Sequence, residues 1–154
     1  MKSIIALSDT HGNIQAIEKI MPIIRESDYL FHLGDFFSDV KVFSNEVGEK
    51  THAVLGNCDG GGTDEILTIE DCKILLTHGD KYGVKSGLIN LSLKAKELGV
   101  NVVFYGHTHL PKIESVDGIT FINPGNATRY GQKTYVYAVI NKGKILAKIV
   151  PLYD

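Results

Sequence analysis

Short apolar runs of four to six residues recur along the first two thirds of the chain. They are rich in β-branched or aromatic residues and are bounded by Gly, Asp or Asn, a pattern typical of buried strands. The strands predicted in this way are residues 3–8, 29–33, 52–55, 66–69, 73–77 and 101–105.

Two segments between these runs carry apolar residues at helical spacing instead. Residues 13–27 place four apolar side chains on one predicted helix face, Ile14, Ile17, Met21 and Ile24. Asn13 is the expected N-cap of this helix, and Pro22 is the residue expected to kink it. Residues 86–99 predict a second helix, which begins at Ser86 as its cap and ends at Gly99.

The chain after residue 110 reads as four apolar segments separated by the turn sequences DG, NPGN and NKGK. Such separators predict antiparallel hairpins. Helices that alternate with strands, followed by hairpins, predict an α/β fold: a four-layer αββα sandwich of two packed mixed sheets flanked by helices. No repeat, low-complexity tract or linker divides the sequence, so we expect residues 1–154 to form one domain.

Composition narrows the classes of partner. Of the 154 residues, 44% are hydrophobic and 22% charged, which is enough for a sizeable core. The formal net charge of -2 provides no basic field to hold a long nucleic acid. Two cysteines are too few for a disulfide framework, an aspartate interrupts the start before a signal-peptide core could form, and no long apolar segment predicts a transmembrane helix. We therefore expect a cytoplasmic protein with no membrane partner.

Polar side chains that can bind metals follow five of the predicted strands. The sequences are SDTHG, GDF, GNCDG, THGD and GHTH, and their candidate donors are Asp9, His11, Asp35, Asn57, His78, His107 and His109. Ligand sites in open α/β sheets gather at the carboxyl ends of strands. We therefore expect the five clusters to meet in one crevice.

Four imidazoles, two carboxylates and one amide oxygen are too many donors for a single tetrahedral ion. A pair of ions roughly 3.5–4 Å apart could share a bridging carboxylate and a bridging water. In an extended segment residues i and i+2 point the same way, so Asp9 with His11, and His107 with His109, would flank such a pair. Each imidazole of GHTH would then serve a different ion. Taken alone, each aspartate would be interpreted as a turn residue or helix cap, and His78 as a solvated side chain. The presence of all these side chains at strand ends favours metal binding.

The order of these motifs resembles that of the calcineurin-like metallophosphoesterases, D-x-H, G-D, G-N-[H/C]-[D/E], H-G and G-H-x-H. The resemblance covers most of the chain and implies a β-sandwich flanked by helices. It also implies one metal held by Asp9, His11, Asp35 and His109, and a second held by Asp35, Asn57, His78 and His107. Asp35 would bridge the two ions.

Cys58 stands where the larger phosphatases of this superfamily have a histidine that assists the leaving group. A thiol does this poorly, because its ordinary pKa is about 8.5 and it donates weak hydrogen bonds. With the short length, this departure resembles the small YfcE-type phosphodiesterase branch. Cys58 is either a catalytic group or a small turn residue, and Asp59 either orients the site or is an exposed acid.

Four other polar residues carry weaker signals. Asn57 could contact the phosphate as well as its metal. Arg129 could clamp a substrate oxygen, although a solvated surface arginine is the plainer interpretation. His32 and His52 fall outside the family's ligand positions, and we expect structural roles for them.

The resemblance and the charges together predict a dinuclear phosphodiesterase that hydrolyses small phosphodiesters through a metal-bridging hydroxide. Two divalent ions bring four positive charges, and Asp9, Asp35 and hydroxide remove three, so a diester monoanion is attracted. We expect manganese, while nickel, zinc, iron and cobalt suit the same donors. The alternatives are a non-catalytic scaffold on the same fold, or a phosphomonoesterase acting on small phosphates. An exposed edge strand in the C-terminal hairpins could pair two copies as a homo-oligomer.

Overall fold

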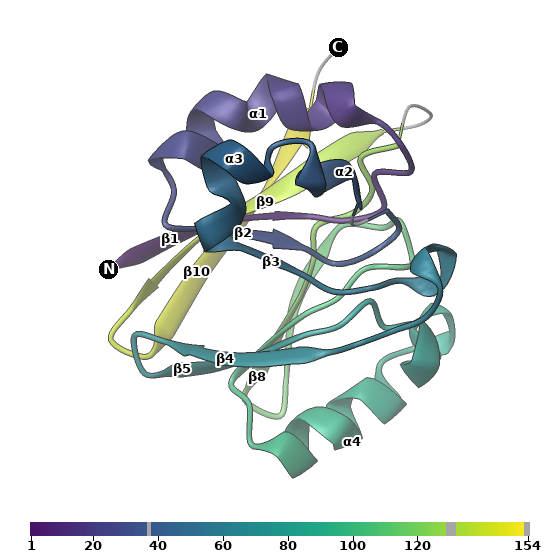
Figure 1. The fold of residues 1–154 in the computed structure, drawn as a ribbon. Helices are drawn as coiled ribbons and strands as arrows, with labels where there is room; N and C mark the ends of the chain where they lie inside the picture. Colours follow the sequence, from purple (N-terminus) through teal and green to yellow (C-terminus); the bar gives the residue numbers. More distant parts are fainter. Residues whose placement is uncertain (37, 129–131, 153–154) are drawn as a thin grey trace.

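The computed structural model describes residues 1–36, 38–128 and 132–152 and contains two five-stranded sheets that face each other (Figure 1). The strands of the first sheet lie in the order β10-β9-β1-β2-β3. Their bounds are β1 (Lys2–Leu7), β2 (Tyr29–His32), β3 (Thr51–Ala53), β9 (Lys133–Asn141) and β10 (Lys144–Leu152). β1, β2 and β3 are parallel, whereas β9 runs antiparallel to both β1 and β10.

The second sheet has the order β4-β5-β6-β8-β7. Its bounds are β4 (Glu65–Ile69), β5 (Cys72–Leu76), β6 (Val102–Phe104), β7 (Lys112–Val116) and β8 (Ile119–Asn123). β5, β6 and β8 are parallel, and β4 and β7 pair antiparallel at the two edges. Both sheets are therefore mixed, as predicted.

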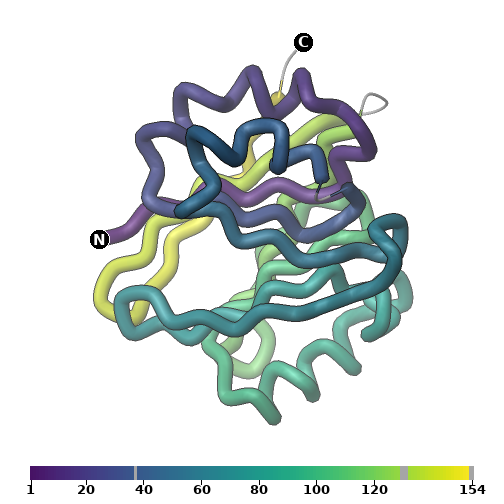
Figure 2. Tube along the Cα trace, in the orientation of Figure 1, coloured from purple at the N-terminus to yellow at the C-terminus, as the bar shows by residue number. Residues whose placement is uncertain are grey.

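Helices cover the outer face of each sheet (Figure 2). The outer face of the first sheet carries α1 (Ile14–Glu26), α2 (Ser38–Lys41) and α3 (Ser44–Val47), and that of the second carries α4 (Ile89–Leu98). Four 3-10 turns complete the element order, η1 (Gly48–Lys50), η2 (Asn57–Asp59), η3 (Asp80–Tyr82) and η4 (Val84–Ser86). In the described residues no helix is both long and apolar enough to cross a bilayer.

Strands buried on both faces explain the continuous apolar runs. Ile4 and Ala6 of β1 point into the core between the sheets, while Ile5 and Leu7 point toward α1. In β6, Val102 and Phe104 enter the same central core, and Val103 packs under α4. Three apolar clusters thus lie between the four layers of helices and sheets. The predicted αββα class is confirmed.

The first helix begins as predicted, whereas its capping bond and the start of the second helix differ from the prediction. Asn13 occupies the N-cap of α1, but its side-chain amide donates to the Ala127 carbonyl at 2.9 Å and makes no cap. α4 begins at Ile89 after Leu88, not at Ser86, because Gly87 has a φ of 123°, which is not helical. The predicted end at Gly99 is confirmed, with a left-handed φ of 68°.

Candidate metal centre

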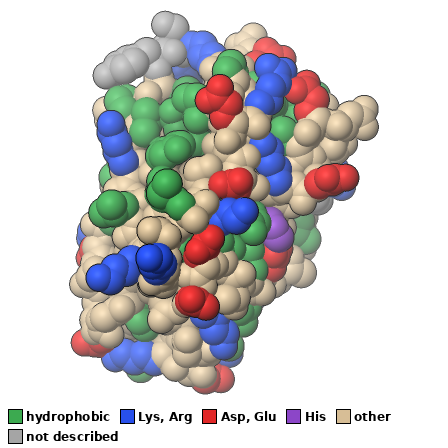
Figure 3. All heavy atoms as spheres, turned by 90° about the vertical axis from the view of Figure 1, so that its left-hand side faces the viewer, with side chains coloured by type: hydrophobic (Ala, Val, Ile, Leu, Met, Phe, Trp, Pro, Cys, Tyr) green, Lys and Arg blue, Asp and Glu red, His purple; other side chains and the backbone are tan. Residues whose placement is uncertain are grey.

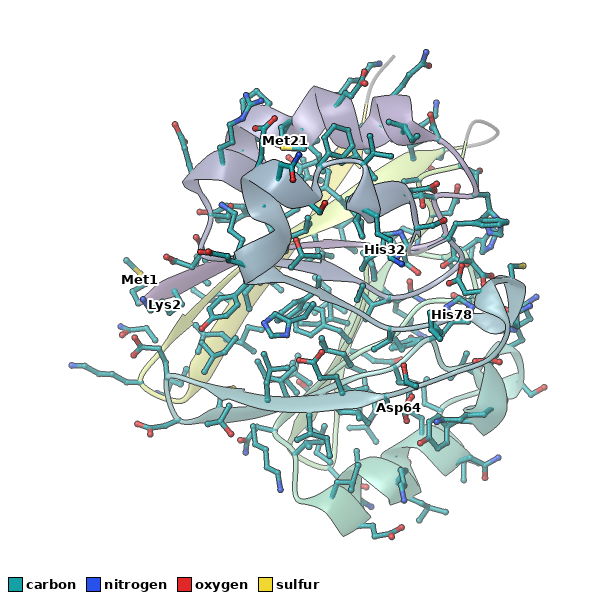
Figure 4. The ribbon with its side chains drawn as sticks, in the orientation of Figure 1. Met1, Lys2, Met21, His32, Asp64 and His78 are labelled. Carbon is teal, nitrogen blue, oxygen red and sulfur yellow. The ribbon has the colours of Figure 1, made fainter. Side chains whose placement is uncertain are left out.

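Five loops meet where the parallel strands end, and they bring all seven predicted donors together. Asp9 and His11 follow β1, Asp35 follows β2, Asn57 lies in η2 after β3, His78 follows β5, and His107 and His109 follow β6. In Figure 4, His78 lies at this end of the sheets and Met1 at the opposite end. The loops converge as predicted, because the parallel strands of each sheet all end on the same side.

His78 is the centre of the first donor group. Its Nε2 atom lies 3.0 Å from Asn57 Oδ1, 3.1 Å from His107 Nδ1 and 3.3 Å from Asp35 Oδ2. His78 Nδ1 lies 2.6 Å from the Leu33 carbonyl, which can only accept, so the proton sits on Nδ1 and Nε2 presents a lone pair. Lone pairs of Asn57, Asp35 and His78 then converge with no hydrogen between them. A cation among these atoms would relieve that repulsion.

Asp9 anchors the second donor group. Its Oδ1 atom lies 3.1 Å from His109 Nε2 and 3.7 Å from His11 Nε2, and His11 Nε2 lies 3.8 Å from Asp35 Oδ2. Asp9 Oδ1 and His11 Nε2 are both buried, and neither has a hydrogen-bond partner of acceptable geometry among the described residues. Orphaned buried polar atoms are costly, and a metal ion would satisfy both.

The chemistry of both groups suits divalent transition metals. The groups Asp9–His11–His109 and Asp35–His78–His107 each place their ligand atoms within 4.8 Å of one another. Imidazole nitrogen with carboxylate oxygen fits manganese, iron, cobalt, nickel or zinc. Asp35 contacts both His78 and His11, so its carboxylate lies between the groups. The residues present thus fit metal ions.

The predicted extended geometry of the paired donors is wrong. Five donors have left-handed backbone, with φ of 54° at Asp9, 45° at His11, 49° at Asp35, 70° at His107 and 65° at His109. Asp9 and His11 consequently reach the same donor group instead of flanking two. The loop after β1 is not extended, because it is hydrogen-bonded to the loop after β2. Asp9 N donates to the Gly34 carbonyl, and His11 N donates to the Asp35 carbonyl. His107 and His109 do reach different groups.

Hydrogen bonds hold the two carboxylates in place. Asp9 Oδ2 accepts from Ser8 Oγ and from the His107 backbone N–H at 3.1 Å. Asp35 Oδ1 accepts from the Cys58 backbone N–H at 2.8 Å. The Asp59 carboxylate accepts from the backbone N–H groups of Asp35, at 2.8 Å, and Gly56, at 3.0 Å. These contacts fix where each free oxygen points.

Cys58 presents its side chain at the exposed rim of this loop. Burial, followed by the charge of Asp35, raises the pKa of its thiol. The group is therefore a neutral thiol at pH 7 and a weak hydrogen-bond donor. Gly56, two residues earlier, can carry no side chain, since a Cβ there would overlap Asp35 Oδ1.

The structure also contains a buried series of hydrogen bonds beside the loop after β1, which was not predicted from the sequence. His32 is fully buried, and its Nδ1 accepts from the Gly34 N–H at 3.2 Å, so Nε2 donates to Thr10 Oγ1 at 3.0 Å. Thr10 in turn donates to the Asp39 carboxylate, which also accepts from the Gly12 N–H at 2.8 Å. Burial lowers the pKa of His32 to about 4, so the ring is neutral. The sequence offered no signal for this chain beyond the position of Thr10 between two donors.

The remaining candidates lie away from the donors or outside the described residues. His52 pairs with Glu65 across the two sheets and packs on Tyr29 and Phe31. Arg129 lies outside the described residues.

Comparison with known proteins decides the family. The model of the calcineurin-like phosphoesterase superfamily domain matches residues 1–143. The chain belongs to this superfamily. The resemblance predicted from the five motifs is thereby confirmed.

Curated members of the superfamily are similar in sequence. A probable metallophosphoesterase of Bacillus subtilis, YsnB, is 35% identical over 128 residues, which cover 80% of this chain and 74% of the relative. The phosphodiesterase YfcE of Escherichia coli K12 is 30% identical over 156 residues, covering 83% of this chain and 80% of YfcE.

Solved structures of the superfamily share the fold. A conserved protein of Streptococcus pneumoniae TIGR4, described as a predicted phosphoesterase, superimposes with a TM-score of 0.81 at 25% identity, covering 97% of this chain and 89% of the other. Vps29 of Entamoeba histolytica, solved with Zn2+, gives a TM-score of 0.76 at 18% identity and covers 97% and 98% of the two chains. At that identity the likeness to Vps29 concerns the fold alone.

Proposed function

We propose that this phosphoesterase is a dinuclear metal-dependent phosphodiesterase that hydrolyses small phosphodiesters. The observation that carries the proposal is the position of Asp35, whose carboxylate lies between two groups of donors. One shared carboxylate with three further donors on each side matches what a pair of divalent ions requires. The names of YsnB and YfcE support the class of reaction.

The residues of the centre set its charge and its shape. Divalent ions bound here would polarise a phosphoryl oxygen and lower the pKa of bound water. Asp9 and Asp35 remove two charges from such a pair and leave a site that attracts a monoanionic diester. The Asp59 carboxylate keeps Asp35 in position through its backbone N–H. Asn57 is exposed, so its amide can reach a phosphate oxygen as well as the donor group.

Cys58 favours esters with good leaving groups as substrates. A neutral thiol protonates a departing oxygen poorly, so substrates with good leaving groups are favoured over monoesters with poor ones. A phosphomonoesterase would be expected to place a stronger acid at this position.

The scaffold alternative rests on the shared fold with Vps29. Against it stand the seven donors, which the chain retains and which the loops bring together. A surface used only for docking has no need of two buried orphan atoms facing each other.

Metal content and a substrate panel test the proposal. After chelation, the protein is reloaded separately with manganese, nickel, zinc, iron or cobalt, and bound metal is measured by mass spectrometry. We expect about two ions per chain, the highest activity with manganese, and faster hydrolysis of bis-p-nitrophenyl phosphate than of p-nitrophenyl phosphate. A chain that binds no metal and hydrolyses neither ester would be a scaffold. A preference for the monoester would identify a phosphomonoesterase.

A further inference from the structure

A groove of about 320 Å³ lies next to the donor groups, between η4, the start of α4 and the loop after β6. Val84 and Tyr105 form its floor and are almost fully buried. Leu88 and Leu110 form its walls, and Thr108, which separates His107 from His109, lines it as well. The loop that carries His107 and His109 therefore also lines the groove.

The floor of the groove packs directly against the loop that carries His78. Gly79 follows His78, and a Cβ on Gly79 would lie 3.1 Å from both methyl groups of Val84 and 3.6 Å from Tyr105 Cβ. On the other side, Thr108 Oγ1 accepts from Asn123 Nδ2 at 2.8 Å and from the Leu110 N–H at 3.2 Å. These contacts place the groove and the donors on one preformed support.

The walls are apolar, and the charged lining residues are two lysines and one glutamate. Leu110 exposes 69% of its surface although it lines a concave region. Lys85 on the rim makes no ion pair with residues 1–36, 38–128 or 132–152, whereas Lys112 pairs with Glu114 at 3.4 Å. The groove thus combines an apolar surface with an unpaired lysine among its described lining residues.

The size of the groove limits what it can hold. At about 320 Å³ it is at the small end of sites for small molecules. One ring fits such a space, and flat apolar groups gain most from contact with leucine and tyrosine side chains.

We propose that this groove binds one ester substituent of the phosphodiester, an aromatic or nucleobase-like ring, while the phosphate occupies the donor groups. This inference rests on the proposed phosphodiesterase function. It makes Leu110 and Leu88 specificity-determining residues, and Lys85 a group that attracts the phosphate whatever its substituents are.

Two substrates that share a leaving group test the groove. Bis-p-nitrophenyl phosphate retains an aromatic substituent when p-nitrophenolate departs, and methyl p-nitrophenyl phosphate retains a methyl group. The measured quantity is the ratio of kcat/KM for the aromatic over the methyl diester in the metal-loaded protein. We expect Leu110→Ser to lower this ratio about fivefold. Leu93→Ser, which changes another exposed leucine, on α4 and not among the lining residues of the groove, should leave the ratio unchanged.

A charge variant separates binding of the ring from attraction of the phosphate. Lys85→Gln should lower kcat/KM of both diesters by a similar factor and preserve their ratio. An unchanged ratio in Leu110→Ser, with diester hydrolysis intact, would overturn the groove and leave the proposed function standing. Absence of diester hydrolysis in the unaltered protein would overturn both. A lower molar mass of Leu110→Ser in light scattering, with no change in ratio, would instead assign the groove to contact with a second copy of the chain.

Discussion

Left-handed backbone occurs at both ends of the sandwich, and the two ends use it for different reasons. At the hairpin end, positive φ values fall in two-residue turns at Glu70–Asp71, Asp117–Gly118 and Lys142–Gly143. Consecutive left-handed residues match the twist of paired strands. Figure 3 views this end and shows basic and acidic side chains intermixed on its surface. Here turn geometry alone determines which residues are suitable.

At the opposite end the same conformation is imposed on aspartates and histidines that the chemistry requires. His107 and His109 sit at φ of 70° and 65°, values at which glycine or asparagine would be less strained. In the neighbouring loops, buried or partly buried side chains hold the backbone. Asp59 accepts from the Asp35 N–H, Asp39 from the Gly12 N–H and His32 from the Gly34 N–H. At the hairpin end, a substitution by glycine or asparagine could relieve the left-handed backbone strain. At the metal centre, the same strain is kept because the aspartates and histidines are needed there.

The largest expected effect comes from Asp35→Asn, which sharpens this contrast. Asparagine keeps the shape of the side chain and tolerates left-handed backbone, but it removes the charge shared by the two donor groups. Turnover of bis-p-nitrophenyl phosphate should fall on the order of a thousandfold or more, with metal lost during dialysis. The measurement is steady-state kinetics together with metal analysis.

The matched control is Asp71→Asn in the β4–β5 turn, where the aspartate has a φ of 67°. Both variants change a left-handed aspartate to asparagine, and only the one at the metal centre should lose activity. Similar activity in the two variants would contradict the role assigned to Asp35.

The next effect concerns His32, which supports the metal centre from below. Because burial lowers its folded pKa to about 4, from an ordinary value of 6.5, the unfolded chain takes up a proton first as the pH falls. Folding stability that depends on neutral His32 is thus present above pH 6.5 and is lost as the pH falls toward 4. The loss amounts to about 3 kcal/mol.

His32→Gln isolates this contribution. The variant should be less stable than the original protein at pH 7, and the difference between the two should shrink by about 3 kcal/mol at pH 4. Urea unfolding followed by circular dichroism measures it, since the chain has no tryptophan. A difference that stays constant across this pH range would show that His32 titrates alike in both states.

The fold could be predicted largely because its strands are buried on two faces. Residues such as Ile4 and Ile5 point to opposite cores, so their strand is apolar throughout and ends where polar residues begin. The start of α4 was missed because Gly87 interrupts the helical backbone, and a glycine inside an amphipathic pattern does not reveal its φ. The four-residue helices α2 and α3 are too short to show a period.

The convergence of the candidate donors could be predicted because each lies in a loop that follows a strand. Their conformation could not, since aspartate and histidine carry no local preference strong enough to indicate positive φ. The support of the site was missed for a different reason. Thr10 and Asp39 are 29 residues apart, and only the packing of α2 beside the loop after β1 brings them into contact. Long-range hydrogen bonds of this kind have no signature in the sequence.

The smallest expected effect tests the hairpin end. Lys142 has a φ of 51°, is exposed and precedes Gly143 in the β9–β10 turn. Lys142→Asn creates the Asn-Gly pair that such turns favour, and it should raise the free energy of unfolding by about 0.5–1 kcal/mol. Lys144→Asn, at the exposed start of β10, removes the same charge without a left-handed backbone and should stabilise nothing. Urea unfolding compares the two variants at equal ionic strength. An equal rise in the free energy of unfolding of both variants would show that the loss of charge causes the effect. The left-handed backbone at Lys142 would then not be a source of strain.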